Sequence, residues 1–134
     1  MSGVEYSESI ETLVAGDLAP FFVGWPNPPG VEHRLAILQA ASEVIVARAS
    51  DGVVGFVTAI TDGTFAAFLP LLEVRSDAQG LGIGSELVNR MLVRLRTCYS
   101  IDLVCDDDVV PFYERLGGTR LTGVAWRNPA GLQT

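Results

Sequence analysis

Residues 79–87 read Gln79-Gly80-Leu81-Gly82-Ile83-Gly84-Ser85-Glu86-Leu87, and this stretch decides the fold. Its glycines alternate between the end of an apolar strand and the start of a helix. Glycine lets a ligand approach the backbone closely, and the first N–H groups of a helix lack intrahelical partners and favour an anion. The stretch predicts either a pyrophosphate cradle or a tight strand-to-helix turn without a ligand, and the spacing alone leaves both open.

Two common nucleotide-binding loops fit this stretch poorly. A Walker A loop needs a lysine, and the chain contains none. A Rossmann fingerprint opens the first of several βαβ units, whereas here a strand meander precedes the glycines. The sequence therefore favours a different kind of phosphate site.

The segments after the glycines predict a crossover. Apolar residues repeat at helical spacing from Leu87 to Leu95, which predicts an amphipathic helix of about 15 residues. An apolar strand follows at 101–105, and a strand–helix–strand unit of this length predicts two parallel strands. A short helix over 109–116 and a last strand over 119–127 complete the chain.

The segments before the glycines predict an antiparallel meander and two helices. The predicted elements are a strand within 4–15, a helix over 18–23 capped by Asp17, a proline-rich loop over 24–30, a helix over 31–43, and strands over 44–49, 53–60 and 64–74. The order β-α-α-β-β-β-α-β-α-β predicts an α/β fold with a mixed sheet, and the length predicts one domain over residues 1–134.

Composition excludes several classes of protein. Nine basic residues, all arginine, stand against sixteen acidic ones, a net charge of −7 that argues against nucleic acid and anionic membranes as partners. No apolar run is long enough to span a membrane. Residues 1–10 lack the basic start of a signal peptide, so Cys98 and Cys105 are expected to be reduced thiols in a cytoplasmic protein.

Two motifs carry a family resemblance. Leu72-Glu73-Val74 and the following glycine stretch resemble the acetyl-CoA motif R/Q-x-x-G-x-G/A, matched by Gln79, Gly82 and Gly84. A second signature, an Asn followed seven residues later by a Tyr and then by Gly-Phe, matches Asp106, Tyr113 and Gly117 in spacing. Asp106 departs from the usual Asn and Gly118 from the usual Phe. Over 69–118 the chain is similar to the GNAT (GCN5-related) N-acetyltransferase superfamily.

The resemblance implies a GNAT fold, with acetyl-CoA as cosubstrate and a direct transfer of acetyl to an amine. It implies that the pantetheine arm is bound by the backbone of Leu72 and Val74 and contacted by Asp106. It implies that backbone N–H groups from Leu81 to Ser85 hold the pyrophosphate. The cofactor-binding residues of this motif would be Gln79, Gly80, Leu81, Gly82, Ile83, Gly84 and Ser85. Tyr113 would lie beside the CoA sulfur.

The chemistry needs an acid and a base. Only about one alkyl amine in a thousand is neutral at pH 7, so a base must remove a proton, and an O–H group can assist the leaving thiolate. Tyr113 is the expected acid, although a core aromatic would show the same spacing. Glu73 is the expected base or water-holding group, although a period of two could also point it to solvent. Phe68 stands where some family members carry a catalytic Glu.

The acceptor is expected to be a primary amine of a small molecule or peptide. Phe21 and Trp25 could form an apolar or cation-binding wall for it, or Trp25 could merely pin the proline loop to the core. Two Cys and one His are too few for a metal site. Because Phe68 cannot accept a proton, an alternative function stays open, in which a GNAT-fold module binds acyl-CoA without transferring the acyl group.

Two further expectations concern the whole chain. Small members of the family often pair, which implies a homodimer with the apolar last strand as interface. The segment from Arg75 to Arg96 carries net charge +2 while the remainder is acidic. Arg75 is therefore the expected side-chain contact to the CoA phosphates.

Overall fold

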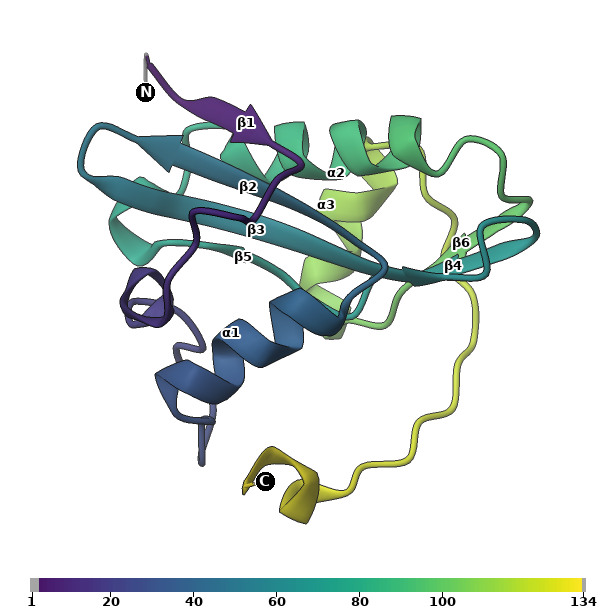
Figure 1. Ribbon diagram of the computed structural model, residues 1–134. Coiled ribbons are helices and arrows are strands. Elements are labelled where there is room, and N and C mark those ends of the chain that lie inside the picture. Colours follow the sequence, from purple (N-terminus) through teal and green to yellow (C-terminus); the bar gives the residue numbers. More distant parts are fainter. Residues whose placement is uncertain (1–2, 134) are drawn as a thin grey trace.

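The computed structural model describes residues 3–133, which form a mixed sheet with helices on both faces (Figure 1). The strands are β1 (Glu5–Ser7), β2 (Glu43–Ala49), β3 (Gly52–Thr61), β4 (Ala66–Phe68), β5 (Leu72–Val74) and β6 (Ser100–Asp102). The α-helices are α1 (Val31–Ala40), α2 (Ile83–Arg94) and α3 (Val110–Arg115). Short 3-10 turns are η1 (Ala15–Leu18), η2 (Ser76–Ala78), η3 (Asp107–Val109) and η4 (Pro129–Gln133).

The strand order is β1-β2-β3-β4-β6, with β5 also paired to β3. The pairs from β1 to β5 are antiparallel, and β4 pairs with β6 in parallel, as the crossover predicted. The predicted α/β fold class is therefore confirmed. Among the described residues, no helix combines the length and apolar content that a membrane span requires.

The two helical layers bury different faces of the sheet. Alternate side chains of β3 point to opposite sides, and a register shift against β2, which leaves Val54 without a partner residue, puts Val54 on the same side as Val57. Both valines pack with the fully buried Leu87 and Met91 of α2. On the other face, Phe56 packs with Leu18 and Leu38. Figure 1 shows α2 above the sheet and α1 below it.

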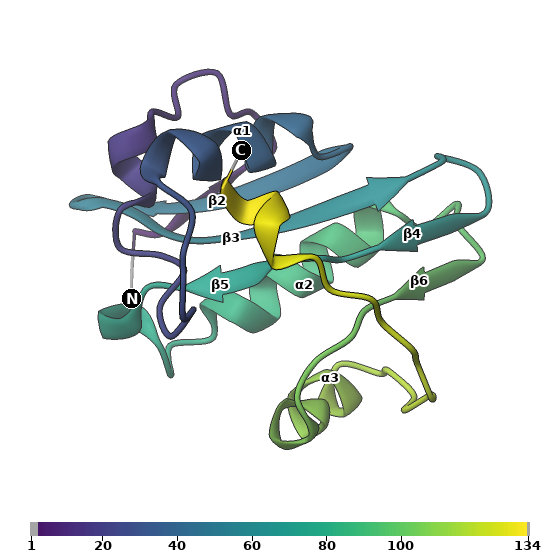
Figure 2. The same cartoon turned by 90° about the horizontal axis from the view of Figure 1, so that it is seen from below.

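The predicted strand over 64–74 is split into β4 and β5. Pro70 lies between them and has no N–H to donate to a ladder. Strand β4 pairs with the end of β3 and with β6, whereas β5 pairs only with Gly55–Val57 of β3. Figure 2 shows β5 and β6 apart, with α3 beside the space between them. Among residues 3–133, this divergence leaves one edge of β5 without a neighbouring strand.

The predictions for the first thirty residues were wrong in two places. The strand expected within 4–15 is limited to β1, and the helix expected over 18–23 is absent. Asp17 is not an N-cap but lies within η1, where it accepts a hydrogen bond at 2.9 Å from the N–H of Val14, the residue before η1. Pro20 cannot donate within a helix, and the carbonyls of Leu18 and Phe21 accept hydrogen bonds from a distant arginine instead.

The predicted last strand over 119–127 is also wrong. The segment leaves α3 as an extended coil and passes the end of the sheet before η4 (Figure 1). Its composition favours a strand, but a strand exists only where a partner edge completes its hydrogen bonds. In the described chain this segment has no such partner.

Candidate active site

The turn before α2 has backbone conformations that require glycine. Gly82 is the N-cap of α2 at φ 83°, and Gly80 lies at φ 79°, both in the left-handed region. No side chain caps the helix, and a Cβ on either glycine would meet no atom within 4 Å. The N–H groups of the first turn, Ile83 to Ser85, therefore lack intrahelical partners and border open space. This arrangement suits an anion.

Gly84 and Gly55 differ in how closely other atoms approach them. A Cβ at Gly84 would lie 3.5 Å from both Phe112 Cζ and Val74 Cγ2, an ordinary contact distance, so position 84 lies where α2 packs against α3 and β5. A Cβ at Gly55 of β3 would lie only 3.0 Å from the Glu73 carbonyl oxygen, so glycine there lets β3 and β5 approach closely. Gly55 was not predicted as a site residue, although a glycine inside an apolar strand is a signal of close backbone approach.

The free edge of β5 presents the backbone groups that sequence analysis singled out. The Thr58 N–H donates to the Leu71 carbonyl at 3.0 Å, and the Arg75 N–H donates to the Val54 carbonyl at 2.8 Å. Because bonding direction alternates along an antiparallel strand, Leu72 and Val74 direct their backbone groups away from β3. An extended ligand could pair with β5 at this edge.

A cleft of about 450 Å³ lies beside this edge. It is lined by Trp25, Leu69, Pro70, Leu71, Leu72, Glu73, Val104, Cys105, Asp106, Val109, Tyr113 and Arg127. It thus brings together five residues predicted from sequence: Trp25, Leu72, Glu73, Asp106 and Tyr113. The predicted residues from Gln79 to Ser85 lie instead in the turn before α2 and its first helical turn.

Two predicted residues have buried side chains. Phe21 is 3% exposed and packs edge-on against Phe56, with ring centroids 5.1 Å apart. It belongs to the core and offers a substrate almost no surface. Ile83 is also 3% exposed, so only its backbone N–H can face a ligand.

The Glu73 carboxylate faces a backbone N–H rather than solvent. It is half-buried and accepts a hydrogen bond from the Phe22 N–H, at 2.9 Å to Oε1 and 3.1 Å to Oε2. Phe22 adopts the left-handed region at φ 64°, which is rare for a bulky residue. Burial raises the pKa of Glu73 above its usual value, while the Phe22 bond and the Arg34 charge act in the opposite direction.

The loop that carries Trp25 is held by Arg34 of α1. The Arg34 guanidinium donates to the carbonyls of Leu18, Ala19, Phe21 and Pro29, at 2.8–3.1 Å. It also lies over the Phe22 ring, 5.3 Å from its centroid. Sequence analysis missed Arg34, although a cation following a proline-rich loop could have indicated such a carbonyl clamp.

Trp25 is ordered at the mouth of the cleft by these contacts. Its side chain remains 37% exposed, and its ring lies edge-on to Phe22 with centroids 4.9 Å apart. Arg34 and Glu73 both bind the backbone of this short segment, at the Phe21 carbonyl and the Phe22 N–H. Together they place one exposed aromatic face on the cleft wall.

Tyr113 of α3 keeps its proton at neutral pH. Burial raises the pKa of its phenol, and the neighbouring Cys105 thiol acts in the same direction. The hydroxyl group can therefore donate a hydrogen bond within the cleft. Cys105 was expected in the strand core, but it is exposed and lines the cleft with Tyr113.

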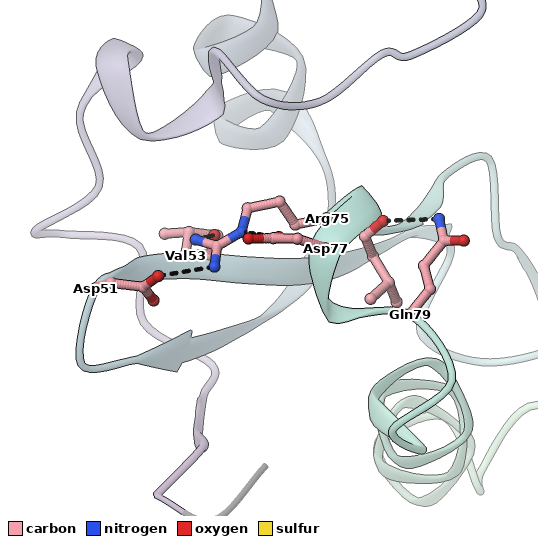
Figure 3. A network of polar contacts seen from close by, with 6 residues as sticks. Asp51, Val53, Arg75, Asp77 and Gln79 are labelled. Atoms are coloured by element: carbon pink, nitrogen blue, oxygen red, sulfur yellow. Dashed lines mark hydrogen bonds and ion pairs between the residues drawn. The ribbon is translucent and has the colours of Figure 1, made fainter.

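Arg75 does not present a free cation. Its guanidinium donates to Asp51 at 2.9 Å and to Asp77 at 2.6 Å, and its side chain is 14% exposed (Figure 3). Arg75, which was predicted to contact the CoA phosphates, instead links the β2–β3 turn to η2 through these two ion pairs. Figure 3 also shows the Gln79 side-chain amide, which donates to the Val74 carbonyl at 3.3 Å.

The chain resembles a known family and several known proteins in sequence. The model of the acetyltransferase (GNAT) family matches residues 10–118. The uncharacterized N-acetyltransferase ycf52 of Pyropia yezoensis is 30% identical over 100 residues, covering 71% of this chain and 58% of the relative. The chloroplastic GCN5-related N-acetyltransferase 2 of Arabidopsis thaliana is 28% identical over 116 residues, covering 71% of this chain and 45% of the relative. The chain thus spans about half the length of these relatives.

Solved structures share both sequence and architecture with this chain. A Deinococcus radiodurans protein assigned as an acetyltransferase is 45% identical, with a TM-score of 0.93 over 98% of this chain and 92% of its own. A GNAT-family acetyltransferase of Streptococcus pneumoniae is 26% identical, with a TM-score of 0.74 over 93% of this chain and 96% of its own. The chain belongs to the GNAT family of acetyltransferases.

Proposed function

We propose that this chain is a single-domain N-acetyltransferase that transfers acetyl from acetyl-CoA to a primary amine of a small molecule or peptide. The observation that carries the proposal is the cleft beside the edge of β5, which both Glu73 and Tyr113 line. A group that can accept a proton and a group that can donate one thus line a single cavity.

The residues present fit acetyl-CoA. The backbone of Leu72 and Val74 would bind the pantetheine arm as an added strand, with Asp106 nearby in the cleft wall. The uncapped first turn of α2, from Ile83 to Ser85, would hold the pyrophosphate. When bound, acetyl-CoA supplies a thioester whose carbonyl carbon accepts the amine.

In the transfer, Glu73 accepts a proton and Tyr113 donates a hydrogen bond or a proton. Glu73 takes a proton from the ammonium, directly or through a water, and so frees the nitrogen lone pair. As the C–N bond forms and the C–S bond breaks, Tyr113 donates a hydrogen bond or its proton to the departing sulfur. Burial of both groups supports these roles, because it raises the pKa of the carboxyl and keeps the phenol protonated.

Trp25 provides the acceptor wall in this proposal. Its exposed face lines the cleft, and an aromatic face attracts ammonium groups. Phe21 is left out because its ring lies in the core. The cytoplasmic location expected from sequence stays a prediction, since a relative of this chain is named as chloroplastic.

The experiment is thiol release from acetyl-CoA over a broad amine panel, with Tyr113→Phe as the test variant. We expect kcat for the best amine to fall by about 10²–10⁴-fold in Tyr113→Phe, while calorimetry finds acetyl-CoA affinity unchanged. Tyr99→Phe is the matched control, because Tyr99 is 85% exposed and outside the cleft. It should retain wild-type kcat.

Two outcomes would overturn the proposal. If wild type binds acetyl-CoA but no amine accelerates thiol release, the chain is an acyl-CoA-binding module, in keeping with Phe68 at the family's base position. If calorimetry detects no binding of CoA or acetyl-CoA, the glycine turn has no cofactor role.

A further inference from the structure

Arg127 is a cation in the wall of the candidate active site, and the proposed reaction gives it no role. It belongs to the segment after α3, which runs past β6 toward η4 (Figures 1 and 2). This segment brings Arg127 to the cleft that Glu73 and Tyr113 also line. Among the described residues that line this cleft, Arg127 alone has a cationic side chain.

The Arg127 guanidinium forms no ion pair with any carboxylate of residues 3–133. Its hydrogen bond there joins Nη1 to the neighbouring Trp126 carbonyl at 3.4 Å, which is long for such a bond. Arg120 on the same segment, by contrast, donates to Asp107 at 2.6 Å. A guanidinium has several N–H donors in a fixed fork, so Arg127 keeps donors available for an anion.

The cleft also contains carboxylates that leave Arg127 unpaired. Asp106 lines the same wall, yet within the described chain no ion pair joins it to Arg127. Glu73 accepts hydrogen bonds from the Phe22 N–H instead. One cavity therefore holds a positive group and two acidic groups that do not neutralise one another. Such a cavity is complementary to a ligand that itself carries both an ammonium and an anionic group.

The balance of charge in the cleft selects the kind of anion. A guanidinium binds carboxylates and phosphates alike, through two parallel N–H···O bonds. A phosphate monoester carries about 1.5–2 negative charges at pH 7, and a single arginine beside Asp106 and Glu73 does not balance that charge. A carboxylate carries one negative charge, which one guanidinium matches.

We propose that the acceptor is a small amino acid whose carboxylate is bound by Arg127 while Glu73 and Tyr113 act on its amine. This inference rests on the proposed acetyl transfer and narrows its acceptor class. The C–N bond forms as the C–S bond breaks, so the ammonium and the thioester become an N-acetyl amino acid, the CoA thiol and one released proton. The carboxylate itself is unchanged.

The size and walls of the cleft support a small acceptor. Its volume of about 450 Å³ must hold the acetyl end of the cofactor as well as the acceptor, which favours a small molecule over a peptide chain. Trp25 offers its exposed face to the ammonium end. A small amino acid has no net charge, so its selection depends on Arg127 within the cleft rather than on the acidic surface as a whole.

The test compares glycine, β-alanine and γ-aminobutyrate, each with its own carboxamide, as acceptors in thiol release from acetyl-CoA. For the best acid, we expect a wild-type kcat/KM at least about tenfold above that of its carboxamide. Amine basicity cannot produce this preference, because the carboxylate keeps more of the neighbouring amine protonated. Phosphoethanolamine should be a poorer acceptor than the best acid, and a preference for it would overturn the assignment of a carboxylate.

Variants of Arg127 test the contact itself. Arg127→Gln should raise KM for the acid by about tenfold or more and leave KM for the carboxamide unchanged. Arg127→Lys keeps the charge and should keep part of the preference, whereas Arg127→Glu should favour a diamine. Arg115→Gln is the matched control, because Arg115 is also an exposed arginine but lies outside the cleft lining. Circular dichroism checks that each variant is folded.

Three results would overturn the inference: equal use of acid and carboxamide by wild type, a preference that persists in Arg127→Gln, or a loss in that variant confined to the KM of acetyl-CoA. The last result would assign Arg127 to the cofactor. If no amine accelerates thiol release, the proposed transfer fails instead. Calorimetry of each acid and its carboxamide, with and without CoA, then tests the inference alone, and equal or undetectable binding of the two would overturn it.

Discussion

At the residue scale, Glu73 illustrates how a distant partner defines a carboxylate. From sequence, the alternation of side chains along the strand allowed the Glu73 carboxylate to face either the protein interior or solvent. The structure places it against the Phe22 N–H, 51 residues earlier in the chain. Its partial burial disfavours the charged form and raises its pKa. The same contact ties the candidate base to the loop that carries Trp25.

This position predicts a pH dependence that Glu73→Gln should remove. Glu73 can accept a proton only when ionised, and its raised pKa shifts that ionisation above the usual range of about 4.3. We expect wild-type kcat/KM to rise with pH through this pKa. Glu73→Gln keeps an oxygen for the Phe22 N–H but should lower kcat/KM and lose that rise. Glu114→Gln, an exposed change in α3, is the control. An acid limb that persists in Glu73→Gln would exclude Glu73 as the base.

At the element scale, the start of α2 separates two uses of glycine. Gly80 and Gly82 have positive φ, whereas Gly84 has close neighbours instead. The motif alone does not distinguish these two roles of glycine. The open space before Gly82 makes it the position where an added methyl group would act on a ligand rather than on the protein core.

Gly82→Ala should therefore weaken cofactor binding, while Gly63→Ala should not. Both glycines lie at positive φ, 83° and 74°, with open space around them. Alanine at either position should cost about 1–2 kcal/mol of unfolding free energy, measured with denaturant. In calorimetry, only Gly82→Ala should lose acetyl-CoA affinity, because Gly63 lies in the β3–β4 turn. Equal affinity in both variants would show that the turn does not contact the cofactor.

At the scale of the whole molecule, the net charge is −7, and the basic segment of the sequence offers few unpaired arginines to an anion. The segment from Arg75 to Arg96 is basic in sequence, but most of its arginines form ion pairs. The pairs are Arg75 with Asp51 and Asp77, Arg90 with Glu86, and Arg94 with Glu8 and Glu43. Backbone N–H groups, rather than these side chains, are left to hold an anionic cofactor.

This charge distribution predicts opposite salt effects for the two substrates. Salt screens the attraction between the acidic surface and a cationic amine, so kcat/KM for the amine should fall as ionic strength rises. The fall should be steeper for a diamine than for the matched monoamine. The KM for acetyl-CoA should not rise, because screening also weakens its repulsion from the protein. A steep rise in that KM would mean that arginine side chains bind the phosphates.

The sequence by itself determined the middle of this protein. The meander, the glycine turn, helix α2 and the parallel strand β6 follow from local periodicity and from backbone conformations that glycine alone adopts readily. Tertiary structure decided the rest: the burial of Phe21, the hydrogen bonds of Arg34 that stand where a helix was predicted, and the unpaired segment 119–127. Each depends on which distant group completes a hydrogen bond or covers an apolar surface. Core packing brings such groups together from distant parts of the chain, so the local sequence pattern does not predict these contacts.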